Sequence, residues 1–329
     1  SRTRCTRWVG SIGGICRGRV SFYRFFVLNL QKIKLMFYRR KILLALLETF
    51  DGQLSKIRLQ KMLLIFSEMQ QRNCYEFVPF KYGCFSFSAN ADLSIMENKG
   101  MIKSDEKSWY NITKENYSAT LTKEDQQILQ FIKTNFGHYN TNDFIRYTYI
   151  NYPFFAINSQ IAREKLSAEE FKIIQDSRPV RTTTTLFTIG YEGVSLENYL
   201  NKLIIYDIKL LCDVRNNPFS MKYGFSKKQL ENFCSQLGIK YIHMPEVGIK
   251  SSERQNLDSQ SDYNYLFDKY KRDVLSKTLE SQTQILYLLK KYHRIALTCF
   301  EANVCQCHRN HLAEAITKLP DWQYELMHI

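Results

Sequence analysis

The spacing of apolar and polar positions changes its period about midway along the chain, and this change separates two structural units. In the first unit, four apolar residues follow the 0, 3, 4, 7 spacing of an amphipathic helix: Leu59, Met62, Leu63 and Phe66. Residues 86–100 predict a second helix that ends at Gly100, and residues 120–136 predict a further one. The first unit is therefore expected to be mostly helical.

Residues 101–113 read as two short strands around a polar turn. Helices followed by a small hairpin predict a winged-helix-like domain over residues 36–175, with one helix placed to enter a DNA groove. A helical protein-docking module that carries a β-hairpin is the alternative. The net charge of this segment is small, so both interpretations stay open.

A polar linker over residues 176–185 separates this domain from the second unit. Beyond it, short apolar strands alternate with amphipathic helices. One helix is expected to begin at the N-cap Ser195, and another to begin with a capping box formed by Ser226 and Gln229. This alternation predicts an α/β fold over residues 186–329, a Rossmann-like parallel sheet with helices on both faces.

Polar residues follow each of the four predicted strands. In chain order they are Tyr191 and Glu192, then Asp213 and Arg215, then His243 and Glu246, then Cys299 and Glu301, and finally Cys307, His308 and Arg309 at the start of the last helix. The carboxyl ends of parallel strands lie along one edge of a sheet, where α/β proteins bind ligands. We therefore expect these side chains to meet in one crevice.

Carboxylates and guanidinium groups in one crevice are typical of an enzyme that grips phosphate and hydrolyses a bond. Three carboxylates, Asp213, Glu246 and Glu301, are expected to supply acid–base chemistry or to ligate a divalent metal such as Mg²⁺. Arg215 and Arg309 are expected to bind phosphate, and Tyr191 and His243 to contact the substrate. His308 is a candidate proton relay, although His243 and His308 are equally well explained as structural residues. Replacing Arg215 or Glu301 by alanine is expected to abolish turnover and to leave stability nearly intact.

Three cysteines and His308 fall within residues 296–316 and raise two further hypotheses. They have the ligand types of a zinc site, but neighbouring residues on a helix, such as Cys307 and His308, point in different directions. Alternatively, Cys307 is a nucleophile whose pKa is lowered by the helix N-terminus and by Arg309. Cys299, at the end of an apolar strand, is expected to be an ordinary buried thiol.

Composition adds constraints on location and partners. The formal net charge of +14 is uneven, because residues 1–35 hold eight basic and no acidic side chains. That segment is an upstream stretch outside the natural start, a targeting peptide or a basic arm for nucleic acid. The nine scattered cysteines favour a reducing cytoplasm. No apolar run is long enough for a transmembrane helix, so no membrane partner is expected.

Residues 186–316 contain the ordered motifs TIGYEG, CDVRNNPFS, FSKKQL, GIKYIHMPEVGI and CFEANVCQCHR. With these motifs the second unit resembles domain-of-unknown-function family 488. The resemblance implies a Rossmann-type domain with polar motifs at its strand ends, and by position it includes Cys299 among the matching residues. Cys305 falls where the family has a variable polar residue. The first unit loosely resembles the Panacea (SocA-like) antitoxin-associated domain.

Together these observations predict a hydrolase of the nuclease or N-glycosidase type that acts on a nucleic acid or nucleotide. The alternative is a non-enzymatic DNA-binding or antitoxin-like regulator with a ligand-sensing α/β domain. In either case, residues 36–175 would contact nucleic acid or a partner protein.

Overall fold

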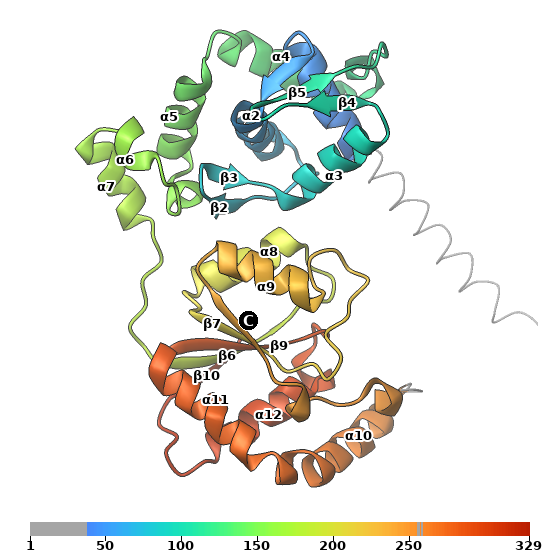
Figure 1. The fold of residues 1–329 in the computed structure, drawn as a ribbon, viewed down its shortest axis with the longest axis vertical. Helices are drawn as coiled ribbons and strands as arrows, with labels where there is room; N and C mark the ends of the chain where they lie inside the picture. Colours follow the sequence, from blue (N-terminus) through green and yellow to red (C-terminus); the bar gives the residue numbers. More distant parts are fainter. Residues whose placement is uncertain (1–37, 255–256, 258) are drawn as a thin grey trace, which may run out of the picture.

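The computed structural model describes residues 38–254, 257 and 259–329 (Figure 1). The basic segment of residues 1–35 lies outside the described residues, so the three interpretations of it stay predictions. The N-terminal domain comes first in the chain and is joined to the C-terminal domain by the segment between Asp176 and Thr185.

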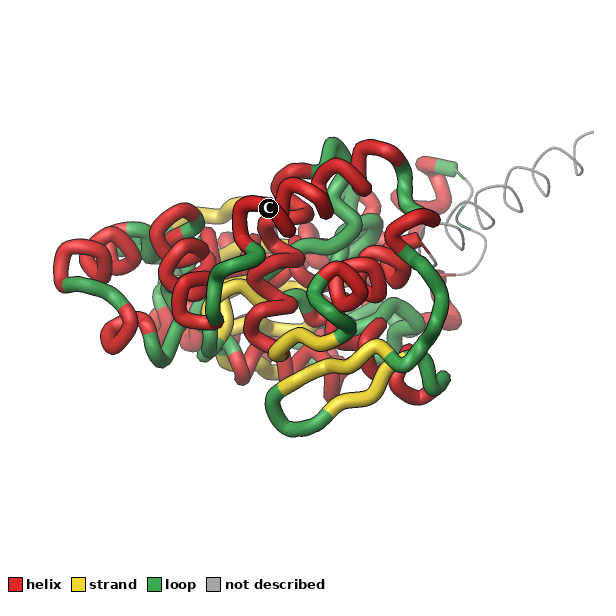
Figure 2. The backbone as a smooth tube through the Cα atoms, turned by 90° about the horizontal axis from the view of Figure 1, so that it is seen from above, coloured by secondary structure: helices red, strands yellow, loops and turns green. Residues whose placement is uncertain are grey.

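Helices predominate in the N-terminal domain, and Figure 2 shows the helices and strands of the whole described chain from above. Residues 38–49 are helical. The elements that follow are β1 (Gln53–Ser55), α2 (Lys56–Met69), β2 (Val78–Phe80), β3 (Gly83–Phe85), α3 (Phe87–Asn98), β4 (Ile102–Ser104), β5 (Ser108–Asn111), α4 (Lys123–Phe136), α5 (Thr141–Asn151), α6 (Ala162–Lys165) and α7 (Ala168–Asp176). Strands β1, β5 and β4 form an antiparallel sheet in that order, and β2 pairs with β3.

The predicted helices and hairpin of this domain are confirmed. The helix over residues 86–100 is α3, which ends before Gly100, a glycine with a positive φ of 68°. The hairpin over residues 101–113 is β4 and β5. The hairpin of β2 and β3 was not predicted, because two three-residue strands carry too little periodicity to be recognised. The winged-helix assignment itself stays a prediction.

The C-terminal domain alternates strands and helices as predicted. Its elements are β6 (Thr185–Gly190), α8 (Leu196–Ile205), β7 (Leu210–Asp213), α9 (Lys227–Gln236), β8 (Lys240–His243), α10 (Gln260–Asp273), α11 (Leu279–Tyr292), β9 (Arg294–Cys299), α12 (His308–Thr317) and β10 (Glu325–His328). Five strands form one sheet in the order β10-β6-β9-β7-β8, and every pairing is parallel. The α/β fold class is confirmed.

Both faces of this sheet are covered by helices, because its central strands are apolar on both sides. Two successive residues of β6 point to opposite faces of the sheet. Phe187 packs with α8 and α9, and Leu186 packs with α10, α11 and α12. Figure 1 shows these two layers on either side of the strands. The helices hold the strands in place, and the carboxyl edge carries the loops discussed below.

Two details of this domain differ from the sequence analysis. The edge strand β10 was not predicted, since its four residues are mostly exposed and alternate weakly. The capping box of Ser226 and Gln229 is wrong. The Ser226 hydroxyl donates to the carbonyl of Ser220, and Gln229 accepts from the main chain of Gly224, so both side chains close the preceding loop instead.

The N-terminal domain packs on the α8–α9 face of the C-terminal domain. The Phe87 and Phe233 rings lie 4.5 Å apart across the contact. Beside them, the buried carboxyl group of Glu197 accepts the main-chain N–H of Ser88 at 2.7 Å and the Ser88 hydroxyl at 3.0 Å. A side chain of α8 therefore satisfies donors in the first turn of α3.

No helix in the described part of the chain combines the length and apolar character needed to cross a bilayer.

Candidate active site

The carboxyl ends of the central strands are level with one another. Gly190 pairs in register with Cys299, and Asp213 lies between Thr298 on one side and His243 on the other. A Cβ atom at Gly190 would collide with the main-chain carbonyl of Glu301. Glycine at this position therefore allows the chain after β9 to fold back over the end of β6.

The first group of polar residues at this edge is the aspartate–arginine cluster of Tyr191, Asp213, Arg215 and Tyr241. Arg215 donates from Nε to Asp213 Oδ1 at 2.8 Å and from Nη2 to Oδ2 at 2.5 Å. Its Nη1 donates to the Tyr191 hydroxyl at 2.6 Å and to the Phe225 carbonyl at 3.0 Å. Tyr241 donates to the same aspartate at 2.7 Å. The ion pair is thus held on all sides.

This environment changes the role expected for Arg215. The side chain is only 5% exposed, and four of its five N–H donors have internal partners. Burial acts to lower the pKa of Arg215, but the hydrogen bonds and charge of Asp213 raise it well above its ordinary value. Arg215 and Asp213 form a buried ion pair in the described structure, not an open phosphate-binding or acid–base pair.

Arg309 is also directed inward. It is 2% exposed, and its guanidinium donates to the main-chain carbonyls of Glu301 and, at 3.1 Å, Ala302. Its Nε has no hydrogen-bond partner among the described residues. Arg309 therefore holds the loop after β9 in place, which is a different task from the phosphate binding predicted for it.

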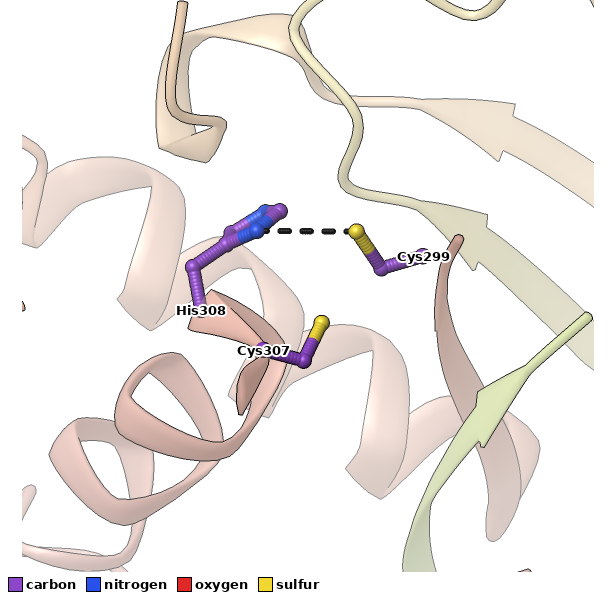
Figure 3. A group of neighbouring side chains, drawn as sticks. All are labelled: Cys299, Cys307 and His308. Atoms are coloured by element: carbon purple, nitrogen blue, oxygen red, sulfur yellow. Dashed lines mark hydrogen bonds between the residues drawn. The ribbon is translucent and has the colours of Figure 1, made fainter. Parts of the chain in front are cut away.

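The second group is the thiol cluster of Arg254, Cys299, Glu301, Cys307 and His308. The ligand atoms of Cys299, Cys307 and His308 all lie within 4.8 Å of one another, and the three side chains are buried. Figure 3 shows the two sulfur atoms and the imidazole ring facing a common point between β9 and α12. Glu301 Oε2 accepts from the Cys299 thiol at 3.2 Å.

The partners of His308 determine which of its ring nitrogens carries the hydrogen. Its Nε2 lies 3.0 Å from the carbonyl of Val214, which can only accept, so Nε2 carries the hydrogen. Its Nδ1 lies 2.7 Å from Nη2 of Arg254, which can only donate, so Nδ1 presents a lone pair. The same Nδ1 is 3.5 Å from the Cys299 sulfur.

Cys307 and His308 do not point in different directions, as was expected for neighbours on a helix. Cys307 is the N-cap of α12, and its extended backbone (φ −129°, ψ 133°) lies outside the helix. Because the helical rotation between neighbours does not apply there, the thiol and the imidazole reach the same side.

The pKa expectations for the two thiols are reversed. Burial raises the pKa of Cys307 to about 12, and the hydrogen bond with Cys299 adds to the effect. For Cys299, burial also acts upward, but the hydrogen bond from Cys307 and the charge of Arg254 outweigh it and lower the pKa to about 7. Both directions are opposite to the sequence-based expectation of an activated Cys307 and an ordinary Cys299.

The carboxylates at this edge are spread apart. Glu301 forms an ion pair with Arg254 and is partly exposed, whereas Glu246 is exposed and accepts from Ser281 at 2.9 Å. Glu192 accepts from the main chain of Ala302. Within the described ranges, the one group of three or more potential metal ligands that converge is that of the thiol cluster. The carboxylates do not form the Mg²⁺ site considered from the sequence.

His243, the last residue of β8, contacts the backbone of the aspartate–arginine cluster. Its Nε2 donates to the carbonyl of Arg215 at 2.8 Å, and its Nδ1 is 3.4 Å from Nζ of Lys227. It is half-buried, and its hydrogen bond to Arg215 fixes the chain after β7.

Two residues of the thiol cluster were given no catalytic or substrate-binding role from the sequence. Cys299 was interpreted as core because its strand is apolar, but the family motif had marked it. Arg254 comes from a short 3-10 helix (Ser251–Arg254) after β8 and carries no local signal. It could be found only through the fold, which brings it to Glu301 and His308.

The fold and the site define the class of this domain. It is a five-stranded parallel α/β domain with a polar cluster at the carboxyl edge of its sheet. Residues 195–316, the larger part of this domain, match the model of the family described as Domain of unknown function DUF488. The match includes all five residues of the thiol cluster and begins after the TIGYEG motif. No curated protein and no solved structure matches the chain.

Proposed function

We propose that the C-terminal domain is a hydrolase that acts on a nucleic acid or nucleotide, with the thiol cluster as its chemical centre. The observation that carries this proposal is that Arg254, from the segment after β8, meets Glu301 and His308 of the β9–α12 segment at the ligand-binding edge of the sheet.

Glu301 is the acid–base group of this proposal. Its side chain is 15% exposed, so water and substrate can reach a carboxylate that buried neighbours hold in place. Hydrolysis requires a group that takes a proton from the attacking water and returns it to the leaving group, and a positioned glutamate can do both. Glu246 lies on the same edge but is exposed and lacks such neighbours.

Arg254 takes over the anion-binding role first assigned to Arg215 and Arg309. Its side chain is 23% exposed and lies beside Glu301. A guanidinium that reaches solvent can bind a phosphate oxygen or stabilise the charge that develops during hydrolysis. Arg215 and Arg309 stabilise the site indirectly, because their hydrogen bonds fix the chain at the ends of β7 and β9.

The loop after β7 supports a nucleic-acid or nucleotide substrate. It exposes Phe219, which is 68% accessible, and Tyr223, at 45%, and it leads to the exposed Lys227 and Lys228 at the start of α9. Exposed aromatic rings next to cations bind single-stranded nucleic acids by stacking and charge attraction. Phe300, directly after Cys299, is a further exposed ring at this edge.

Residues 36–175 would then recognise the nucleic acid or a partner protein, in line with a winged-helix-like domain. The rival function is a DNA-binding or antitoxin-like regulator whose α/β domain senses a ligand. The first turn of α3 packs against α8 rather than facing solvent, which leaves the remainder of that helix and the β4–β5 hairpin for such contacts.

Incubation in ¹⁸O-labelled water tests the proposal. The full chain is supplied with single-stranded DNA, single-stranded RNA and mononucleotides, and products are analysed by mass spectrometry. We expect cleavage products that carry one labelled oxygen from the solvent. Salt-dependent binding of nucleic acid with no labelled product from any substrate would overturn the hydrolase and favour the regulator.

A further inference from the structure

We propose that Cys299, Cys307 and His308 form a zinc-binding site. The inference rests on the proposed function only for its hydrolytic role, in which zinc would supply the water that Glu301 deprotonates. The ligand geometry stands on its own, so the site can be tested without a substrate.

One pair of ligand atoms already has the separation that a tetrahedral ion requires, and the third ligand atom lies close to both. Zinc bonds of about 2.3 Å to sulfur and 2.0 Å to nitrogen place these atoms roughly 3.5 Å apart. The Cys299 sulfur and His308 Nδ1 are 3.5 Å apart, and no pair of ligand atoms in the group exceeds 4.8 Å. The remaining separations, at most 4.8 Å, would shorten towards about 3.5 Å by movement of the Cys307 sulfur as the ion binds.

The orientation of His308 is that of a metal ligand. Metal-binding histidines usually donate their second ring N–H to a carbonyl or carboxylate, which fixes the tautomer and aims the other nitrogen. Here the carbonyl of Val214 takes the Nε2 hydrogen, and Nδ1 faces the two sulfur atoms. The imidazole is thus prepared to bind before any ion arrives.

Charge also favours zinc over a hard cation. Two thiolates balance the charge of Zn²⁺, so the bound group is neutral and suits a site where all three ligands are buried. Thiolate and imidazole ligands select zinc over magnesium, which prefers oxygen.

The fourth position falls on the side of Glu301. Its Oε2 lies 3.2 Å from the Cys299 sulfur, close enough to accept a hydrogen bond from a zinc-bound water. Three protein ligands with an open fourth position are typical of catalytic zinc. On zinc binding, His308 Nδ1 would lose its hydrogen bond from Arg254 and bond to the ion instead. Arg254 would keep its ion pair with Glu301.

Cobalt titration of the full chain tests this inference directly. After removal of metals with a chelator, Co²⁺ is added and the absorption spectrum is recorded, and zinc content is measured on the protein as isolated. We expect about one ion per chain, a thiolate-to-cobalt charge-transfer band and the strong visible bands of tetrahedral cobalt.

Variants of the same segment make the test specific. C307S and H308Q should weaken cobalt binding by more than the roughly 10- to 100-fold typical of an outer-shell change. C305S is the matched control, because Cys305 is an exposed thiol in the same segment and should leave binding unchanged. Circular dichroism verifies that each variant is folded.

The zinc site is overturned if the wild type shows no charge-transfer band, if C305S loses binding as C307S does, or if the isolated protein holds a Cys299–Cys307 disulfide instead of an ion. Cobalt binding without any labelled hydrolysis product would leave the site standing and remove the hydrolase. Hydrolysis that survives complete removal of metal would leave the hydrolase standing and overturn the role of zinc in supplying its water.

Discussion

His308 donates its Nε2 hydrogen to the main-chain carbonyl of Val214 at 3.0 Å, although the two residues lie 94 positions apart in the sequence. This hydrogen bond ties the start of α12 to the residue between Asp213 and Arg215. The thiol cluster and the aspartate–arginine cluster are therefore mechanically joined. The first has the reactive groups, and the second fixes the backbone on which they depend.

Substitution of Arg215 is expected to reduce stability before it affects chemistry. R215A leaves Asp213 as an unpaired charge in a site with no solvent access, and breaking a buried ion pair in this way costs about 3–5 kcal/mol. This replaces the sequence-based expectation of nearly intact stability. Urea unfolding of the purified variant measures the loss.

K227A serves as the control for that experiment, because Lys227 is exposed and lies at the same edge. It should change the free energy of unfolding by less than about 0.5 kcal/mol. If R215A were as stable as K227A, the aspartate–arginine cluster would not stabilise the fold. That result would favour the original prediction that Arg215 binds the substrate directly.

Glu197, at the contact between the domains, should make stability depend on pH. Burial raises the pKa of Glu197, and the hydrogen bonds from Ser88 offset only part of that effect. The protonated form is thus favoured in the folded protein. Its contribution is complete below the pKa of the unfolded chain, about 4.3, and is lost as the pH rises through the folded-state pKa.

The variant E197Q has no titrating group at that position and reveals this contribution. The free energy of unfolding of the wild type minus that of E197Q should decrease as the pH rises above the unfolded-state pKa of about 4.3. Chemical unfolding of both proteins across this range measures the difference. A difference that grows with pH would mean that the folded protein prefers the ionised carboxylate.

Phe219 is expected to bind a base of the substrate by stacking. Its ring is largely exposed, so F219A should leave the fold intact and weaken binding of a single-stranded oligonucleotide by about 1–3 kcal/mol. Fluorescence anisotropy at fixed salt measures the affinity. Y287A is the control, since Tyr287 is 60% exposed on α11, which leads to the opposite end of β9. Equal losses in the two variants would contradict a specific stacking site.

The parallel sheet and its loaded edge could be predicted because each central strand is a short apolar run that ends in polar residues. The parallel topology then predicts that these polar residues meet, because parallel strands have their carboxyl ends at one edge of the sheet. The short strands β2, β3 and β10 could not be predicted, because three or four residues do not establish a period.

The division of the site into two clusters could not be predicted from the sequence, for a different reason. Whether a guanidinium faces solvent or a buried carboxylate depends on tertiary contacts such as those of Arg215 with Tyr191 and Asp213. The orientation of Cys307 depends on its position as an N-cap, one residue before the helix begins. Neither property is encoded in spacing alone.

The ratio of kcat/KM between two isosteric variants, E301Q and E246Q, tests the central claim most directly. Both remove one carboxylate from the carboxyl edge, but only Glu301 belongs to the thiol cluster. On the substrate that the full chain hydrolyses, E301Q should lose about 10²- to 10⁴-fold, and E246Q should retain wild-type activity. Equal activity of the two variants would contradict the assignment of this cluster as the site of hydrolysis.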